Sequence, residues 1–324
     1  MKIVTFLLFL QCSLTVFGDI AEVKIALSST EDPQTSGTFV WAKALSDSLQ
    51  QDGWTTTIYP TSTLGGEIVR SEQIRLGLLE INIAGGQEVA GYSELYRALE
   101  LPFQLDSASQ LSRLLAETSL LEELNIKTLP HGLKVVDFVF LGGMGGLFTA
   151  RDPVRRIEDL RPLRMRAMTS EQIQFFEAWE GPATQVAWEE VPQALQTGIA
   201  DGYMNPPIVA VLFGHGPQLK YFSNLRFQPS MRTAVISARW YDSLSTDQQM
   251  SVDHALTVAR SANHQWLKKM AVKEFDMLRE IGIEILEVQE TERDRFRDRI
   301  TPLYRDWVEP SALKRLDEYL EQLK

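Results

Sequence analysis

Residues 23–60 read VKIALSSTEDPQTSGTFVWAKALSDSLQQDGWTTTIYP, and this stretch decides the fold class. Its first five residues, 23–27, are mostly apolar and suit a buried strand. Apolar side chains then recur at helical spacing over residues 36–51, and the β-branched and aromatic run 54–59 ends at Pro60. A strand, a helix and a second strand in this order predict an α/β protein.

The same alternation continues along the chain, with a second sheet beginning after residue 143. Strands that alternate with helices favour a largely parallel sheet covered on both faces. We expect further strands at 79–84, 133–143, 147–149, 162–167 and 234–237, and further helices at 67–76, 170–179 and 188–197.

One segment predicts an unusually long helix. Residues 245–281 contain neither Pro nor Gly, and their apolar residues recur at spacings near three and four, which indicates one helix or two nearly continuous ones. A helix of about 35 residues is roughly 50 Å long, longer than a small domain is wide. We therefore expect it to span two lobes, with a ligand-binding cleft between them.

Composition and motifs argue against several classes of function. A net charge of −11 makes nucleic acid a poor partner. The four histidines form no close ligand set, no nucleophile elbow occurs, and the glycine-rich stretch 142–146 (GGMGG) lacks the Lys and Ser or Thr of a phosphate-binding loop. We predict no catalytic residue, no metal site and no cofactor. The glycines are expected to mark a crossing between lobes, where unusual backbone angles are tolerated.

The N-terminus has the pattern of a signal peptide. Lys2 precedes the apolar run 3–10, and small residues stand at Val16 and Gly18, which predicts cleavage after Gly18 and export to the periplasm. A membrane anchor would need about 20 apolar residues, and polar residues interrupt this run too early. A lipoprotein attached through Cys12 is an alternative. Cleavage after Gly18 leaves no cysteine, so we expect no disulfide and no thiol catalysis.

A specific resemblance lies further along the chain. Residues 194–206, ALQTGIADGYMNP, closely resemble the signature of solute-binding proteins of tripartite ATP-independent periplasmic (TRAP) transporters, the dicarboxylate-binding-protein-like family. The resemblance covers nearly the whole mature chain. Further segments agree with it in order, namely YPTSTLGGE (59–67), SEQIRLG (71–77), ELPFQLDS (100–107), DPVRRIEDLRPLRMR (152–166) and VAWEEV (186–191).

The resemblance implies a fold and a function. It implies a periplasmic binding protein of type II-like architecture, with two α/β lobes around a cleft. Lobe I would comprise residues 19–145 plus 233–271, and lobe II residues 146–232 plus 272–324. Such a protein captures a small organic carboxylate between its lobes and delivers it to a TRAP-type membrane permease, without enzymatic activity. A ligand-sensing protein for a membrane receptor, or a secreted enzyme on the same fold, are alternatives that neighbouring genes would separate.

The resemblance also implies site residues. Arg166 matches the second Arg of the family's K-x-R motif, which forms the main salt bridge with the ligand carboxylate; a guanidinium suits this role because its paired donors match two carboxylate oxygens. Asn205 matches an asparagine that hydrogen-bonds the ligand, and Trp188 matches an aromatic residue that could stack on it. Weaker candidates lie in segments expected to face the cleft: Met168, Phe148, Glu31 and Gln87.

Departures from the family pattern bear on the ligand. Gly146 stands near the position where many members carry a further cleft arginine, so we expect a second carboxylate anchor to be missing. The pattern MRAMT, residues 165–169, is similar to members that bind ectoine-like solutes. Together these features favour a small monocarboxylate, such as an ectoine-like solute, over a C4-dicarboxylate.

Overall fold

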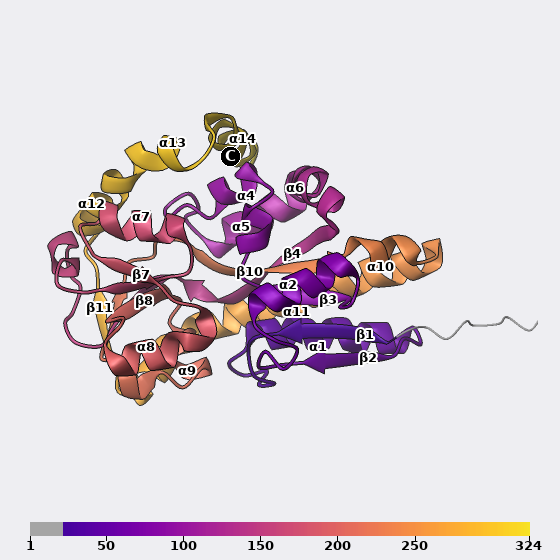
Figure 1. Ribbon diagram of the computed structural model, residues 1–324, viewed down its shortest axis with the longest axis horizontal. Helices are drawn as coiled ribbons and strands as arrows, with labels where there is room; N and C mark the ends of the chain where they lie inside the picture. Colours follow the sequence, from indigo (N-terminus) through magenta and orange to yellow (C-terminus); the bar gives the residue numbers. More distant parts are fainter. Residues whose placement is uncertain (1–21) are drawn as a thin grey trace, which may run out of the picture.

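The computed structural model describes residues 22–324, and two bodies are visible in it, each built on one sheet (Figure 1). The predicted signal peptide, residues 1–18, lies outside the described residues. We call the body on the five-stranded sheet lobe I and the body on the six-stranded sheet lobe II. The predicted α/β class is confirmed.

The sheet of lobe I contains strands from three separate parts of the chain. Strand β1 runs parallel to both β2 and β3, whereas β10 runs antiparallel to β3 and β4. In spatial order its strands are β2 (Thr56–Tyr59), β1 (Val23–Leu27), β3 (Ile81–Ala84), β10 (Pro229–Ser237) and β4 (Leu133–Met144).

The sheet of lobe II is also mixed. Strand β5 runs antiparallel to its neighbours β8 and β9, and the other pairs are parallel. In spatial order its strands are β11 (Glu284–Glu287), β9 (Tyr221–Asn224), β5 (Gly146–Thr149), β8 (Gly202–Asn205), β6 (Met165–Ala167) and β7 (Ala183–Gln185).

The expectation of a largely parallel sheet is therefore wrong. Strand β10 returns from β9 of lobe II into the sheet of lobe I, and a strand that arrives from the other lobe enters between β3 and β4 in the antiparallel direction. It also begins at Pro229, earlier than the predicted 234, so that Arg232 belongs to the sheet of lobe I.

Helices cover the faces of both sheets (Figure 1). The α-helices are α1 (Gly37–Gln51), α2 (Glu67–Leu76), α3 (Gln87–Ala90), α4 (Glu94–Leu99), α5 (Ala108–Glu117), α6 (Leu120–Thr128), α7 (Ser170–Ala178), α8 (Val191–Thr197), α9 (Ile208–Leu212), α10 (Ala238–Ser243), α11 (Thr246–Glu280), α12 (Glu290–Ile300), α13 (Tyr304–Trp307) and α14 (Pro310–Gln322). Short 3₁₀ helices are η1 (Leu129–His131), η2 (Ile157–Leu160), η3 (Trp188–Glu190), η4 (Gly216–Gln218) and η5 (Thr301–Leu303).

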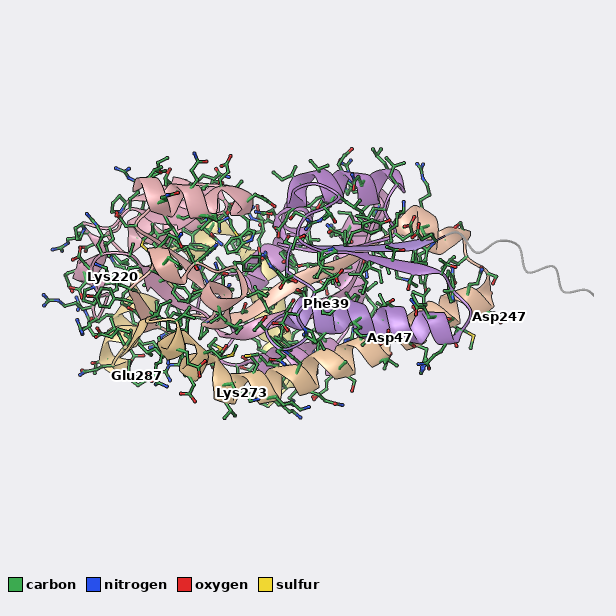
Figure 2. The ribbon with its side chains drawn as sticks, turned by 90° about the horizontal axis from the view of Figure 1, so that it is seen from below. Phe39, Asp47, Lys220, Asp247, Lys273 and Glu287 are labelled. Atoms are coloured by element: carbon green, nitrogen blue, oxygen red, sulfur yellow. The ribbon has the colours of Figure 1, made fainter. Side chains whose placement is uncertain are left out.

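Helix α11 is the predicted long helix, and it is continuous over 35 residues. Ser245 and Gln248 form a capping box that satisfies its first free N–H groups. The helix contacts α1 and β4 of lobe I and then α9 and β11 near lobe II. Figure 2 shows it running from Asp247 beside α1 towards Lys273 under the other body. The prediction that one helix spans both lobes is confirmed.

The glycines of residues 142–146 mark the crossing from β4 to β5, but for a different reason from the one expected. None of them has a positive φ angle. A Cβ atom on Gly143 would lie 2.2 Å from Oε1 of Glu274, and one on Gly145 would lie 2.5 Å from the ring of Phe227. Close packing at the crossing, and not backbone conformation, requires glycine there.

The C-terminal helix departs from the expected division into lobes. Helix α14 packs on α4 of lobe I. Its Arg315 donates from Nε to Oε2 of Glu123 in α6 at 2.7 Å. The placement of residues 310–322 in lobe II is therefore wrong, since this amphipathic helix covers apolar surface of lobe I.

Candidate ligand-binding site

Three neighbouring cavities lie between the two lobes, and Met168 of lobe II lines all of them. The anchor cavity, of about 310 Å³, is lined by Gly66, Glu67, Ile68, Val69, Gln87, Arg166, Met168, Gln185, Ala187, Trp188 and Glu189. The inner cavity, of about 80 Å³, includes Gly85, Glu100, Met168, Gln172, Asn205, Gln228 and Arg232 in its wall. The side cavity, of about 240 Å³, includes Gln87, Arg97, Glu100, Met168, Glu171, Gln228 and Trp307. We call the space that they occupy the cleft.

Arg166 lies in β6, and only 3% of its surface is exposed. Its Nε donates to the carbonyl oxygen of Val186 at 2.8 Å, which fixes the plane of the guanidinium. Within residues 22–324 this is its one side-chain hydrogen bond, so the two Nη groups remain available at the wall of the anchor cavity. A fixed guanidinium with two free donor groups suits a carboxylate.

Neighbouring carboxylates compensate the buried positive charge of Arg166 only in part. Burial lowers the pKa of Arg166 to about 10, and the neighbouring Arg232 adds to this effect, while Glu67 and Glu189 oppose it. A side chain at this pKa is still a cation at neutral pH. A bound carboxylate would supply the missing negative charge.

Trp188 forms the wall beside Arg166. The guanidinium carbon of Arg166 lies 5.7 Å from the centroid of the Trp188 ring, within the range of a cation–π contact. The Trp188 ring packs edge-on against Phe213 and Tyr203, at 4.7 and 6.1 Å between centroids. It also lines the anchor cavity, so one ring both orients the arginine and borders the ligand space.

Lobe I contributes a buried ion pair to the cleft. Glu67, the first residue of α2, lies 3.3 Å through Oε1 from Nη2 of Arg232 in β10. Its Oε2 accepts from the backbone N–H of Gly85 at 3.0 Å, and its Oε1 accepts from Ser28 at 3.0 Å. Burial alone would raise the pKa of Glu67, but Arg232, Gly85, Arg70 and Ser28 together hold the pKa below its ordinary value. Glu67 is therefore a buried carboxylate anion.

A fully buried arginine holds this ion pair in place. The Nε of Arg70 donates to Asn82 at 2.9 Å, and its Nη groups donate to Ser62, to the carbonyl oxygen of Gly65 and to Ser28. Each of its nitrogens thus has a partner within lobe I. Arg70 thus orders the wall behind Glu67 through four hydrogen bonds within lobe I.

The comparison with sequence families decides what kind of protein this is. A sequence model of the family described as bacterial extracellular solute-binding protein, family 7, matches residues 26–310. The chain belongs to this family. The suspected resemblance is confirmed, and the function is that of a solute-binding protein that operates outside the cytoplasm.

Individual relatives of this family 7 protein cover most of its length. The 2,3-diketo-L-gulonate-binding periplasmic protein of Escherichia coli is 24% identical over 280 residues, which are 85% of this chain and 84% of that protein. The C4-dicarboxylate-binding periplasmic protein of Rhodobacter capsulatus is 23% identical over 261 residues, 78% of this chain and 76% of that one.

A solved structure supports the fold directly. A TRAP periplasmic solute-binding protein from Polaromonas sp. JS666, bound to D-erythronate, matches with a TM-score of 0.84 at 20% identity, over 92% of this chain and 98% of that chain. The two-lobed α/β fold of the family 7 protein is thus a known arrangement.

Five of the predicted site residues line the cleft. Arg166, Trp188 and Gln87 border the anchor cavity, Asn205 borders the inner cavity, and Met168 borders both. Asn205 is the last residue of β8, and Pro206 directly after it ends the strand.

Two predicted residues line none of these cavities. Phe148 is completely buried in the core of lobe II, where its ring packs 4.7 Å from Phe222 and 5.2 Å from Tyr203. Its position in the middle of β5 turns the ring into the core of lobe II, away from the cleft. Glu31 is exposed in the loop before α1 and stands outside the cleft walls.

The sequence prediction did not include Glu67 and Arg232, and it expected a second carboxylate anchor to be missing. Gly146 leaves no such group at its own position, yet Arg232 reaches the cleft from β10. The available signal is a charged residue inside a strand, but the predicted strand begins at residue 234 and so excludes Arg232.

Two further expectations concern metals and membranes. Among residues 22–324, no group of three or more His, Cys, Asp or Glu side chains is arranged to hold a metal ion. In the same part of the chain, no helix has the length and apolar character needed to cross a membrane.

Proposed function

We propose that the protein captures a small organic monocarboxylate in the cleft, in the periplasm, and delivers it unchanged to the membrane permease of a TRAP transporter. The observation that carries this proposal is Arg166, which lines the anchor cavity and whose Nη groups make no hydrogen bond within residues 22–324 while Nε is fixed to Val186. The ligand carboxylate binds these two donors.

The charges around the cleft favour one carboxylate over two. Three buried or nearly buried arginines, Arg70, Arg166 and Arg232, lie near two carboxylates, the buried Glu67 and the exposed Glu189. Glu100 also lines the inner cavity, but burial raises its pKa to about 7, so its protonated form adds no charge, and the count then leaves one positive charge in excess. A monocarboxylate neutralises that charge, whereas a dicarboxylate would bring an unpaired anion into a partly desolvated site, which is costly.

The relatives bind acids of more than one kind. The names of the relatives and the solved structure mention 2,3-diketo-L-gulonate, C4-dicarboxylates and D-erythronate, which share a carboxyl group. They support a carboxylate ligand in general. The choice of a monocarboxylate, of which an ectoine-like solute is one example, rests on the charge count.

Binding from both lobes explains how the ligand acts on the protein. Glu67 and Gln87 come from lobe I, and Arg166, Met168 and Trp188 come from lobe II. A ligand that contacts both walls stabilises the closed arrangement relative to an open one, and only this difference in affinity can shift the population. The permease then receives the closed, loaded form.

A thermal-shift screen against small carboxylic acids tests the proposal. At about 100 times Kd, a ligand adds roughly 2.7 kcal/mol to the free energy of unfolding. We expect a monocarboxylate to raise the melting temperature of the wild type and to lose this effect in Arg166→Ala.

Arg164→Ala is the matched control, because Arg164 is exposed two residues earlier in the chain. It should respond to the ligand like the wild type. Full affinity of Arg166→Ala in calorimetry would disprove the anchor. A membrane receptor gene in place of permease genes beside this one would contradict the transport role.

A further inference from the structure

We propose that Glu100 takes up a proton when the cleft closes, so that acidic solvent favours the closed, loaded form and alkaline solvent favours release. This inference rests on the proposed function, since it concerns the regulation of the same cleft. Glu100 is the C-cap residue of α4, and it lines both the inner cavity and the side cavity. It does not line the anchor cavity, where Arg166 lies.

The carboxyl group of Glu100 has little to stabilise a negative charge. Its Oε1 accepts from the hydroxyl group of Tyr96 at 3.0 Å, and this is its one side-chain hydrogen bond within residues 22–324. The free carbonyl groups at the C-terminal end of α4 disfavour an anion at this position. A buried carboxylate without a cationic partner is costly, and a proton removes that cost.

The charged groups around Glu100 are already paired with one another. The titratable and charged side chains that contact it or share its cavities are Glu94, Tyr96 and Arg97 of α4, Glu171 of α7 and Arg232 of β10. Arg97 lies 2.7 Å from Glu94 and 3.4 Å from Glu171. Arg232 lies 3.3 Å from Glu67. Both arginines that line these cavities thus have carboxylate partners, and neither forms an ion pair with Glu100.

Closure of the cleft encloses Glu100 with residues of the opposite lobe. Lobe II contributes five residues to the wall of the side cavity: Met168, Thr169, Glu171, Gln172 and Phe175. An opening of the cleft would take these residues away from α4 and admit water to Glu100. The surroundings of this carboxyl group therefore differ between the two arrangements, although Glu100 itself belongs to lobe I.

The same surroundings set the proton affinity of Glu100. Burial raises its pKa to about 7, the hydrogen bond from Tyr96 opposes the shift, Glu171 adds to it, and Arg232 opposes it. Burial and Glu171 depend on the closed cleft, so opening returns the pKa towards its ordinary 4.5. The proton comes from the solvent on closing and goes back to the solvent on opening.

Gln228 offers a partner for the added proton. It lines both cavities together with Glu100, and its buried Oε1 accepts no hydrogen bond from the described residues. Oε2 of Glu100 likewise makes no hydrogen bond within residues 22–324. A protonated Oε2 is a donor in the cavities where this acceptor lies, whereas an ionised carboxylate can only accept.

A bound acid strengthens the linkage. Its carboxylate adds a negative charge to the closed cleft, which further disfavours ionised Glu100. Because linkage is reciprocal, the proton in turn favours the bound acid. This contribution to affinity is fully present below pH 4.5 and is lost as the pH rises through about 7.

Calorimetry on the wild type tests the inference. The probe is D-erythronate, which is fully ionised between pH 6 and 8; if it does not bind, the tightest-binding acid of the thermal-shift screen replaces it. Titrations in PIPES and in imidazole, whose ionisation enthalpies differ, count the protons taken up. We expect about 0.5 proton per bound acid at pH 7, and binding about tenfold weaker at pH 8 than at pH 6.

Glu100→Gln keeps the shape of the protonated carboxyl group but cannot ionise. At pH 8 we expect it to bind the acid about tenfold more tightly than the wild type, without proton uptake and with the same affinity at pH 6. A damaged fold would not produce a gain of affinity. Glu122→Gln, at an exposed position of α6 in the same lobe, should behave like the wild type.

Tyr96→Phe provides a second variant if Glu100→Gln does not fold. It removes the donor that stabilises ionised Glu100. We expect the loss of affinity with rising pH to shift to higher pH than in the wild type. A shift to lower pH, or none, would contradict the role of Glu100.

The outcomes separate this inference from the proposed function. Binding without proton uptake, or with uptake that persists in Glu100→Gln, would overturn the proton linkage and leave the carboxylate anchor standing. Uptake that disappears in Glu274→Gln instead would place the linkage at the crossing, since burial also raises the pKa of Glu274 to about 7, and would overturn the role of Glu100. No binding of any acid would overturn both.

Discussion

The proposed function depends most on Arg166, whose side chain is fixed by a hydrogen bond to a backbone carbonyl group. The Nε of Arg166 donates to Val186 at 2.8 Å, and the guanidinium faces the Trp188 ring. Lysine in this position would keep a positive charge, but the donors of its single ammonium nitrogen cannot match both carboxylate oxygens in one plane while also reaching Val186. Charge and geometry can therefore be tested separately.

We predict that Arg166→Lys binds the ligand at least tenfold more weakly than the wild type, which is roughly 1.4 kcal/mol. Calorimetric titration with the best acid of the screen measures this difference. An unchanged thermal midpoint without ligand would confirm that the fold is intact. Near-normal affinity would mean that a point charge is enough and that the carboxylate does not engage both Nη groups.

At the scale of elements, the crossing from β4 to β5 leaves little room for a side chain at Gly143. The backbone N–H of Gly143 donates to Oε2 of Glu274 at 3.1 Å, so strand and helix α11 touch directly. A Cβ atom there would stand 2.2 Å from Oε1, far inside any normal contact. Either the Glu274 carboxylate would have to swing away and lose its hydrogen bond to Gly143, or the crossing strand would have to move.

We predict that Gly143→Ala lowers the free energy of unfolding by about 1–3 kcal/mol, the usual cost of overpacking. Urea unfolding measures it. Gly66→Ala is the control, because its nearest contact would be an ordinary 3.5 Å, and it should cost at most about 1 kcal/mol. Equal stability of Gly143→Ala and the wild type would show that the crossing has room to relax.

Most elements could be predicted because their signals are local. The helices α2 and α11 follow from uninterrupted apolar spacing, and Ser36 and Ser245 cap their helices as their positions suggest. The start of β10 could not be predicted in this way, since Pro229, Ser230 and Arg232 are residues more typical of a loop. Only pairing with β3 and β4 makes that segment a strand.

The residues of the candidate site also fall into those with a local sequence signal and those without one. Arg166, Asn205 and Trp188 could be predicted because they stand in a recognisable motif. The Glu67–Arg232 pair joins α2 to β10, which are distant in sequence, and no local pattern reports such a contact. Phe148 lies in a segment that passes near the cleft, but its ring points into the core of lobe II, and no local pattern distinguishes the two directions.

At the scale of the whole molecule, helix α11 joins the two lobes, and polar side-chain contacts around the cleft join them as well. Arg97 of α4 lies 3.4 Å from Glu171 of α7 across the side cavity. Ser62 donates to Glu189 at 3.4 Å at the edge of the anchor cavity. Exposed contacts of this kind are weak, at about 0–1 kcal/mol each. The binding free energy of a ligand can therefore exceed them and shift the population from the open to the closed arrangement.

The contact of α11 with the crossing strand should make stability depend on pH. Glu274 is 4% exposed, and burial raises its pKa to about 7, although the N–H of Gly143 opposes the shift. A carboxyl group with a raised pKa binds protons more readily in the folded state than in the unfolded chain, where its pKa is near 4.5. Its contribution to stability therefore falls as the pH rises from 4.5 to 7.

We predict that Glu274→Gln gains stability relative to the wild type as the pH rises from 5 to 8, by up to about 3 kcal/mol. The buried Glu100, whose pKa burial also raises to about 7, acts in the same direction but is present in both proteins and cancels in the difference. Urea unfolding at pH 5, 6, 7 and 8 measures it, with Glu280→Gln at an exposed position of the same helix as the control. A difference between Glu274→Gln and the wild type that stays constant with pH would mean that Glu274 ionises as easily in the fold as in water, and that helix α11 does not seal this carboxyl group against the crossing strand.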